Sequence, residues 1–468
     1  MGDSNGRLPA TNAMSPREGL ERLAGYPFNV LTWVADDGFP VSVATVAAID
    51  PLAGTASFVV PAGFELPTDR EVSLTGSHIR PQPGYGYDER RHVTAWGRAE
   101  PAGGGRFLLR AEAAWGWDEA EVPFFEYSER NVPRARRYFD SLSAERGTPV
   151  RPRLSLPWLA LRTGRLPFLT ATIIPVMLGI LVAAVHGSFD VLAAVLTVVA
   201  ACFVQIGLNI ANDVFDTIQG ADDLNVTPTQ YSGGSRVIQY GLVSLRGMAA
   251  LSVASFGIAV AIGLVLLATH WSLALLVCGV VGLVLSIGYT APPLRLVYRG
   301  LGEIAVALGF GPIMLVGAFV VQTDGLLSWE PLVASLPVAL LVALILYVNE
   351  IPDRRGDASA GKRTLPVRFP MRTVVRLYLV AAVAAFAIIV AGVVMGVLPW
   401  PALAALAGLP LARRVYLGLP LAYDQPYVLM GFMGTNIRLH LVTGGLLIAA
   451  YAVVIVAGAL VPTTLYLG

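Results

Sequence analysis

Long apolar runs fill the second half of the chain, from Phe168 onward. Most of them reach the roughly 20 residues that a helix needs to cross a hydrocarbon core of about 30 Å. Because such runs satisfy their own backbone in lipid only as helices, we expect an all-α membrane bundle of nine transmembrane helices. The eighth run is short and rich in proline, so we expect it to be broken or tilted. The runs cover 168–187, 190–211, 247–269, 271–289, 302–321, 331–351, 373–396, 398–412 and 439–461.

Basic residues predict how this bundle is oriented. After residue 166 they all fall in or beside the connections that follow the second, fourth, sixth and eighth runs. Because lysine and arginine favour the cytoplasmic side, we predict a protein of the inner (cytoplasmic) membrane. Its N-terminus is predicted to lie on the cytoplasmic side and its C-terminus on the outer side. These residues are Arg236, Arg246, Arg295, Arg299, Arg354, Arg355, Lys362, Arg363, Arg368, Arg372, Arg376, Arg413, Arg414 and Arg438.

The first half of the chain carries a different pattern. Residues 16–146 contain no spanning run, and short strand-like runs alternate there with turn signals such as Asp36-Asp37-Gly38 and Asp50 to Gly54. This pattern predicts a small cytoplasmic β-barrel or sandwich, with helical segments near 17–24 and 131–145. The strand-like runs are Phe28–Val34, Pro40–Ile49, Thr55–Val60, Glu71–Thr75 and His92–Arg98.

Composition sets the remaining boundaries. Residues 1–15 are polar and small, so we expect a disordered tail. Residues 147–165 contain the basic stretch Arg151-Pro152-Arg153 and then an amphipathic segment, Trp158 to Arg165, which is expected to lie at the membrane interface. The membrane domain is therefore predicted over 166–468.

Charge and cysteine content narrow the classes of function. The net charge of +1 gives no electrostatic case for binding nucleic acid. Residues 1–25 lack the apolar core of a signal peptide. Cys202 and Cys278 both lie in apolar runs, so they are expected to be buried without a disulfide. The oligomeric state is left open.

Two acidic motifs stand where long apolar runs end. The first is Asn212-Asp213-Val214-Phe215-Asp216, followed by Asp222, and the second is Asn349-Glu350-Ile351-Pro352-Asp353, followed by Asp357. Charges at membrane depth cost roughly 2.5–3.5 kcal/mol each on insertion scales, which favours a functional reason for both. Solvated caps of two helix ends are the alternative, and for one motif alone they would be the better interpretation.

The spacing suggests the chemistry. If the helices continue through the motifs, Asn212 and Asp216 share one face, and Asn349, Asp353 and Asp357 share another. Mg²⁺ prefers one or two carboxylates together with phosphate oxygens and water. Two such faces across a cavity would bind a Mg²⁺-diphosphate, and the metal would neutralise the leaving group as a C–O bond breaks.

Basic residues near the motifs add anion-binding groups. Lys362 and Arg363 follow Asp357 closely, and both are expected to contact a diphosphate. Between the second and third runs, Tyr231-Ser232-Gly233-Gly234-Ser235-Arg236 offers backbone N–H groups and one guanidinium to an anion.

The N-terminal half resembles the pyridoxamine-phosphate-oxidase-like split barrels. The residues that carry the resemblance are 27–32, 36–40, 72–78 and 93–100. Because members of that family bind flavin, deazaflavin or haem, the resemblance implies a possible flavin site, although the sequence contains no clear set of arginines or lysines to hold a phosphate.

The membrane half resembles the UbiA superfamily of intramembrane prenyltransferases, and within it the dihydroxynaphthoate polyprenyltransferases of menaquinone synthesis. Besides the acidic motifs, the matching segments are 289–295, 298–303 and 360–365. Asn349-Glu350 departs from the Asn-Asn or Asn-Asp of many naphthoate enzymes.

The resemblance implies a Mg²⁺-dependent enzyme that transfers a polyprenyl group from polyprenyl diphosphate to an aromatic acceptor, and it favours 1,4-dihydroxy-2-naphthoate as that acceptor. Asp216, Asp353 and Asp357 are then the catalytic residues, and the diphosphate is bound by Asn212, Asn349, Arg236, Lys362 and Arg363. The metal ligands are Asp213, Asp216, Asp222, Asp353 and Asp357. A UbiA-type enzyme with another acceptor, a cation-coupled transporter and a membrane-tethered flavin reductase are the alternatives.

Overall fold

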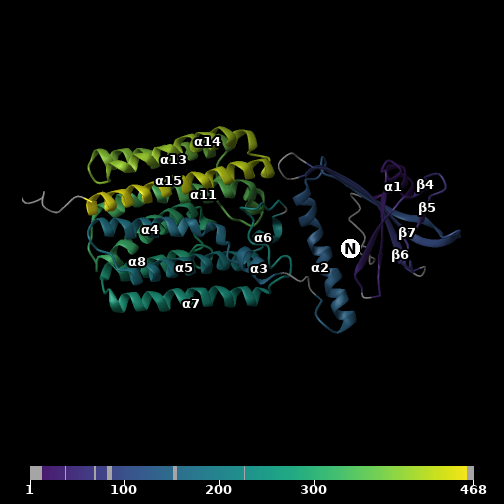
Figure 1. Ribbon diagram of the computed structural model, residues 1–468, viewed down its shortest axis with the longest axis horizontal. Coiled ribbons are helices and arrows are strands. Elements are labelled where there is room, and N and C mark those ends of the chain that lie inside the picture. The colour runs from purple at the N-terminus through teal and green to yellow at the C-terminus, as the bar shows by residue number, and fades with distance from the viewer. Residues whose placement is uncertain are drawn as a thin grey trace, which may run out of the picture. The chain divides into compact units, whose positions relative to one another are not determined.

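The computed structural model describes residues 13–36, 38–67, 70–81, 87–150, 155–225 and 227–460 (Figure 1). It divides the chain into two compact units, Met1–Arg151 and Pro152–Gly468, each of which is described by itself. Asp37 of the expected turn, the stretch Arg151-Pro152-Arg153 and the first 12 residues of the expected tail lie outside the described residues.

The first unit is built on one antiparallel sheet in the order β3-β2-β6-β7-β8-β5-β4, with β1 paired to β8. Thr45 at the end of β3 donates to the carbonyl of Val59 on β5 at 2.8 Å, so the sheet curls into a β half-barrel. The strands are β1 (Ala13–Met14), β2 (Asn29–Val34), β3 (Pro40–Thr45), β4 (Ala48–Asp50), β5 (Thr55–Val59), β6 (Glu71–Pro81), β7 (Tyr87–Gly103) and β8 (Arg106–Asp118).

Alternation along these strands explains the core. Leu31 and Trp33 on β2 point inward together with Val72 and Leu74 on β6, and they pack with Leu20 and Leu23 of α1 (Pro16–Leu23). Ser15 caps the N-terminus of this helix, because its hydroxyl accepts from the N–H of Glu18 at 3.2 Å. A longer helix, α2 (Phe124–Arg146), follows the sheet.

Two features of this unit differ from the sequence prediction. Ala13–Met14 form a strand paired with Trp115 and Ala114, so these two residues do not belong to a disordered tail. The strand β8 was not predicted. Alanine has low strand propensity, and the run Arg110-Ala111-Glu112-Ala113-Ala114 reads poorly as a strand, whereas pairing with β7 along its length overrides that local preference.

The second unit is a helical bundle (Figure 1). Its principal helices are α4 (Thr170–Val185), α5 (Val191–Ile218), α7 (Leu245–Thr269), α8 (Leu273–Gly288), α9 (Gly302–Leu308), α10 (Met314–Gln322), α11 (Trp329–Ser359), α13 (Met371–Val394), α14 (Leu409–Ala422) and α15 (Pro426–Leu460). A short π-helical turn, Gly309–Ile313, joins α9 to α10, and a 3₁₀ segment, Trp400–Gly408, precedes α14. Short helices α3 (Leu156–Thr163), α6 (Ala221–Leu224) and α12 (Leu365–Arg368) lie in the connections.

Every predicted apolar run coincides with a helical segment, but not all are equally long. Among the described residues, seven helical stretches are long and apolar enough to cross a membrane, which makes the chain a polytopic membrane protein. Two of the nine predicted runs form shorter apolar helices of 16 residues, α4 and α8. The eighth run consists of the 3₁₀ segment followed by α14, in line with the expected break.

The last two runs were predicted too short. The eighth helical stretch ends at Ala422 and α15 begins at Pro426, so Arg413 and Arg414 lie within α14 and Arg438 within α15 rather than in a connection. Polar side chains interrupted the hydropathy pattern here, yet inside the bundle they are satisfied. Asn436, for example, donates to the carbonyl of Leu344 at 2.8 Å and accepts from the hydroxyl of Tyr378 at 3.0 Å.

Candidate active site

Both acidic motifs lie within continuous helices, as the spacing argument required. Helix α5 continues to Ile218 and α11 to Ser359, past their respective motifs. Asn212 donates through Nδ2 to Asp216 Oδ2 at 3.0 Å, one turn away on the same face. The two motifs meet at one polar cavity of about 170 Å³.

Asp216 is held by three donors. Besides Asn212, the hydroxyl of Tyr298 donates to Oδ1 at 2.8 Å, and Lys362 Nζ lies 3.1 Å from Oδ2. Lys362 also lies 3.7 Å from Asp357 Oδ1, so one ammonium joins the first motif to the second. Burial alone would lower the pKa of Lys362, but the carboxylates of Asp216 and Asp357 raise it well above its ordinary value. The lysine therefore stays charged.

Asp353 connects the second motif to the loop after α6. Its Oδ1 accepts from Asn225 Nδ2 at 2.8 Å, and its Oδ2 accepts from the backbone N–H of Gly233 at 2.9 Å. Gly233 and Gly234 both have left-handed backbones, with φ of +77° and +76°. A Cβ at Gly234 would lie 2.9 Å from the carboxylate of Asp222, so the loop approaches that acid closely only because glycine stands there.

Asp222 lies in the short helix α6, outside the spanning helices, and its side chain is buried. Burial, with the carboxylates of Asp216 and Asp213 nearby, raises its pKa well above the usual range. No group among the described residues donates to its Oδ2. Arg236, whose own backbone is left-handed with φ of +64°, donates to the backbone carbonyl of Asp222.

Asp213 faces away from the cavity. Its carboxylate accepts from Arg165 Nη2 at 2.7 Å and from the N–H of Ser235 at 3.2 Å. Arg165, which precedes the first membrane helix, itself lines the cavity. Arg162 on α3 donates to the carbonyl of Ser235 at 2.9 Å, so the segment predicted to lie at the membrane interface is fastened to the site loop.

The structure thus brings most of the predicted site residues to one cavity and leaves three outside it. Asp213 pairs with Arg165, Arg236 is buried behind Asp222, and the side chain of Arg363 is exposed. The predicted residues on the cavity wall are Asn212, Asp216, Asp222, Asn349, Asp353, Asp357 and Lys362. Sequence reasoning assigned no role to four residues that contact these groups or line the cavity: Arg165, Asn225, Tyr298 and Glu350.

The donor set fits a hard divalent cation. The wall carries acidic groups in excess over Lys362 and Arg165, and oxygen is the ligand atom that Mg²⁺ prefers. Four buried oxygens without an N–H or hydroxyl donor among the described residues belong to this wall: Asp222 Oδ2, Asn349 Oδ1 and both carboxyl oxygens of Glu350. Within the described residues, no three His, Cys, Asp or Glu side chains gather closely enough to hold an ion alone. A Mg²⁺ ion would therefore need phosphate oxygens or water as further ligands.

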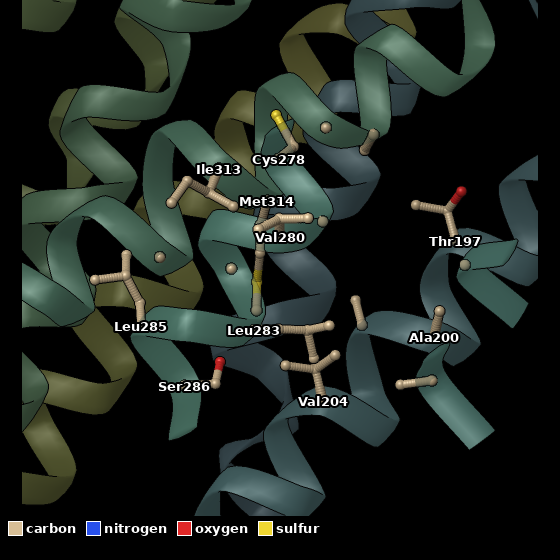
Figure 2. A pocket seen from close by; sticks show the side chains of 18 of the residues that line it. Thr197, Ala200, Val204, Cys278, Val280, Leu283, Leu285, Ser286, Ile313 and Met314 are labelled. Atoms are coloured by element: carbon tan, nitrogen blue, oxygen red, sulfur yellow. The ribbon is translucent and has the colours of Figure 1, made fainter. Parts of the chain in front are cut away.

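A second cavity adjoins the first. It measures about 380 Å³ and is lined almost wholly by apolar side chains of α5, α7, α8 and α10, including Val204, Leu283 and Met314 (Figure 2). Its wall contains Leu264 and Val280, which are 61% and 52% exposed on the surface of the bundle. The cavity thus reaches the face that lipid would cover. Both cavities share Gln205, Leu208, Tyr289, Val306 and Phe310, so they lie side by side.

A carboxylate-lined cavity beside an apolar one matches a molecule with a charged head and an apolar tail. The chain belongs to the UbiA prenyltransferase family, whose sequence model matches residues 172–437. The match begins after the first unit, so it does not extend to the β half-barrel.

Similar proteins carry names from this family. A 1,4-dihydroxy-2-naphthoate octaprenyltransferase of Bacillus subtilis is 29% identical over 234 residues, covering 50% of this chain and 73% of that protein. A 2-carboxy-1,4-naphthoquinone phytyltransferase of Synechocystis is 27% identical, covering 61% and 90%. A UbiA homologue from Archaeoglobus fulgidus, solved with GPP and Mg²⁺, is 15% identical with a TM-score of 0.46, covering 63% of this chain and 99% of that one.

Proposed function

We propose that this prenyltransferase moves a polyprenyl group from polyprenyl diphosphate to 1,4-dihydroxy-2-naphthoate, with Mg²⁺, in menaquinone biosynthesis. The observation that carries the proposal is that the polar cavity and the apolar cavity share part of their walls, because an amphiphilic donor would place its diphosphate among the acids and its chain among the apolar side chains. The names of similar proteins support the naphthoate acceptor.

The residues of the polar cavity take distinct roles in this proposal. Asp216, Asp222, Asp353 and Asp357 would hold Mg²⁺, which when bound neutralises the diphosphate as it leaves. Lys362 remains cationic and adds a direct contact to the same anion. Asp213 was expected to be a metal ligand. In this proposal it instead pairs with Arg165 and fixes that guanidinium at the cavity wall.

The same proposal extends to the first unit and to the bundle. We infer that the half-barrel is a pyridoxamine-phosphate-oxidase-like split barrel on the cytoplasmic side, and that α4 and α8 complete nine spans where the bilayer thins locally around them. The domain limits 16–146, 147–165 and 166–468 belong to this inference.

A transfer assay tests the proposed activity. Membranes containing the protein are incubated with Mg²⁺, labelled geranylgeranyl diphosphate and a panel of aromatic acceptors. We expect diphosphate release and a prenylated naphthalene product, both abolished by EDTA and restored by added Mg²⁺. Mg²⁺-independent turnover would overturn the metal assignment. Cation flux without release of diphosphate would instead support a transporter.

Orientation is tested by cysteine labelling from outside the cell. The distribution of basic residues predicts that the start of α11 faces the outside of the inner membrane and that its end faces the cytoplasm. Leu327→Cys is therefore expected to react with an impermeant maleimide, whereas Ser359→Cys reacts only after permeabilisation. Leu327 is 74% exposed. It is a better position for the cysteine than Gly325 in the same connection, because a Cβ at Gly325 would lie 2.7 Å from Ser272. The parent protein, with Cys202 and Cys278 in membrane helices, gives the background. The reverse labelling pattern would invert the topology.

A further inference from the structure

The junction of the two cavities fixes where the bond-forming carbon of the donor lies. If the diphosphate occupies the polar cavity and the prenyl chain the apolar one, the carbon between them sits beside the residues that both cavities share, among them Tyr289. An aromatic ring that attacks this carbon must reach the same place. Glu350 lines the polar cavity together with Tyr289, which belongs to the walls of both cavities.

Glu350 is a buried acid whose carboxyl contacts the carboxyl of Glu303 and has no other hydrogen-bond partner among the described residues. Its residue is 5% exposed, and no N–H or hydroxyl group of the described chain donates to either carboxyl oxygen. A buried carboxyl without donors costs free energy unless a bound molecule supplies them. Asp216 and Asp353 differ from Glu350, since each accepts from several protein donors, whereas Asp222 has one oxygen to which no described group donates.

A second acid supports this arrangement. Glu303, in the first turn of α9, places its carboxyl beside that of Glu350. Two adjacent carboxyl groups that share one proton still carry one negative charge, so they repel an anion and can accept from a neutral hydrogen-bond donor. A dihydroxynaphthoate presents both kinds of group, a carboxylate and hydroxyls. The pair therefore selects the hydroxyl end of such a molecule and turns its carboxylate away.

We propose that Glu350 binds a hydroxyl of the aromatic acceptor at the junction of the two cavities and that Glu303 is a positioning residue for it. This proposal rests on the proposed prenyl transfer and deepens it, because it assigns an acceptor subsite distinct from the diphosphate-binding acids. It also gives a role to the residue at which this chain departs from the Asn-Asn or Asn-Asp pattern.

Steady-state kinetics of Glu350→Gln test the assignment, because glutamine keeps the volume and removes the charge. We expect the KM for 1,4-dihydroxy-2-naphthoate to rise about tenfold while the KM for geranylgeranyl diphosphate stays within twofold. Glu350→Asp, which keeps the carboxylate, is expected to recover part of the loss. Glu303→Gln is expected to raise the same acceptor KM, and the double variant to show less than the product of the two effects.

Two comparisons make the test specific. Glu330→Gln is the matched control, because Glu330 stands at the opposite end of α11, paired with His186 at 2.7 Å. It is expected to leave both KM values unchanged. The second comparison uses an acceptor with its hydroxyls methylated. Wild type is expected to prefer the free hydroxyl form, and Glu350→Gln to lose most of that preference.

Several results would overturn the assignment. They are equal changes of both KM values, a fall in kcat with neither KM affected, and an undiminished preference for the free hydroxyls. Failure of the wild type to prenylate any hydroxynaphthalene would count against the proposed function itself, so the two failures are distinguishable.

Discussion

Replacing Asp216 or Asp353 by asparagine is expected to reduce prenyl transfer by roughly a thousandfold, about 4 kcal/mol of barrier. Each change removes a carboxylate charge from the polar cavity at almost constant volume. It also turns an amide N–H₂ toward groups that already donate, namely Lys362 and Tyr298 at Asp216, and Asn225 at Asp353. The loss therefore combines weaker metal binding with a disturbed network. The measurement is kcat/KM for the diphosphate donor at saturating Mg²⁺ and acceptor.

Asp223→Asn is the matched control for this prediction. Asp223 belongs to the same acidic segment as Asp222, but its side chain is exposed and lies outside the cavity wall. It is expected to keep wild-type activity. The variants at Asp216 and Asp353 should be monodisperse in detergent with a Tm near that of wild type. If either of them transfers within about threefold of wild type, its carboxylate does not hold the metal.

Local sequence pattern predicted the acidic wall because its spacing is a property of single helices. Asn212 and Asp216 lie one turn apart on α5, as Asn349, Asp353 and Asp357 do on α11, and the pattern required only that both helices continue. That the two helices face each other came from the resemblance and from the functional argument. Spacing alone does not bring two helices together.

The partners of these acids were not predictable in the same way. Tyr298 reaches Asp216 from 82 positions away, and Asn225 reaches Asp353 from 128 positions away. Arg165 was read as the end of an amphipathic segment, because nothing in its local sequence distinguishes a membrane anchor from a residue that pairs with Asp213. Contacts between residues so far apart in the sequence depend on tertiary packing, which the periodicity of the sequence does not encode.

Segment limits failed where polar residues are satisfied by the fold. The start of α15 was placed late because Asn436 and Arg438 interrupt the apolar pattern, whereas Asn436 bonds to α11 and α13 inside the bundle. The strand β8 was missed for the opposite reason, since its alanines carry no strand signal and the neighbouring strands supply the pairing. Both errors arise from long-range hydrogen bonds that a single window of sequence does not contain.

Filling the apolar cavity is expected to shorten the donor that the enzyme accepts. Gly263 on α7 lines this cavity, and a Cβ built there meets nothing within 4 Å. Gly263→Leu therefore projects into the space that we assign to the prenyl chain, and leucine is the better helix former by roughly 0.5–1 kcal/mol. Excluding one isoprene unit from apolar burial costs about 3 kcal/mol at about 0.8 kcal/mol per methylene, which is a factor of roughly a hundred.

We expect kcat/KM for geranylgeranyl diphosphate to fall by about this factor in Gly263→Leu, while kcat/KM for dimethylallyl diphosphate stays within about threefold. Gly257→Leu is the matched control, because Gly257 lies on the same helix, has equally open space at its Cβ and does not line the cavity. It should change neither value. An equal loss for both donors would show that leucine disturbs the polar cavity instead. Unchanged use of the long donor would mean that the prenyl chain follows another path through the bundle. The position of the apolar cavity beside the polar one would then no longer support the proposed function.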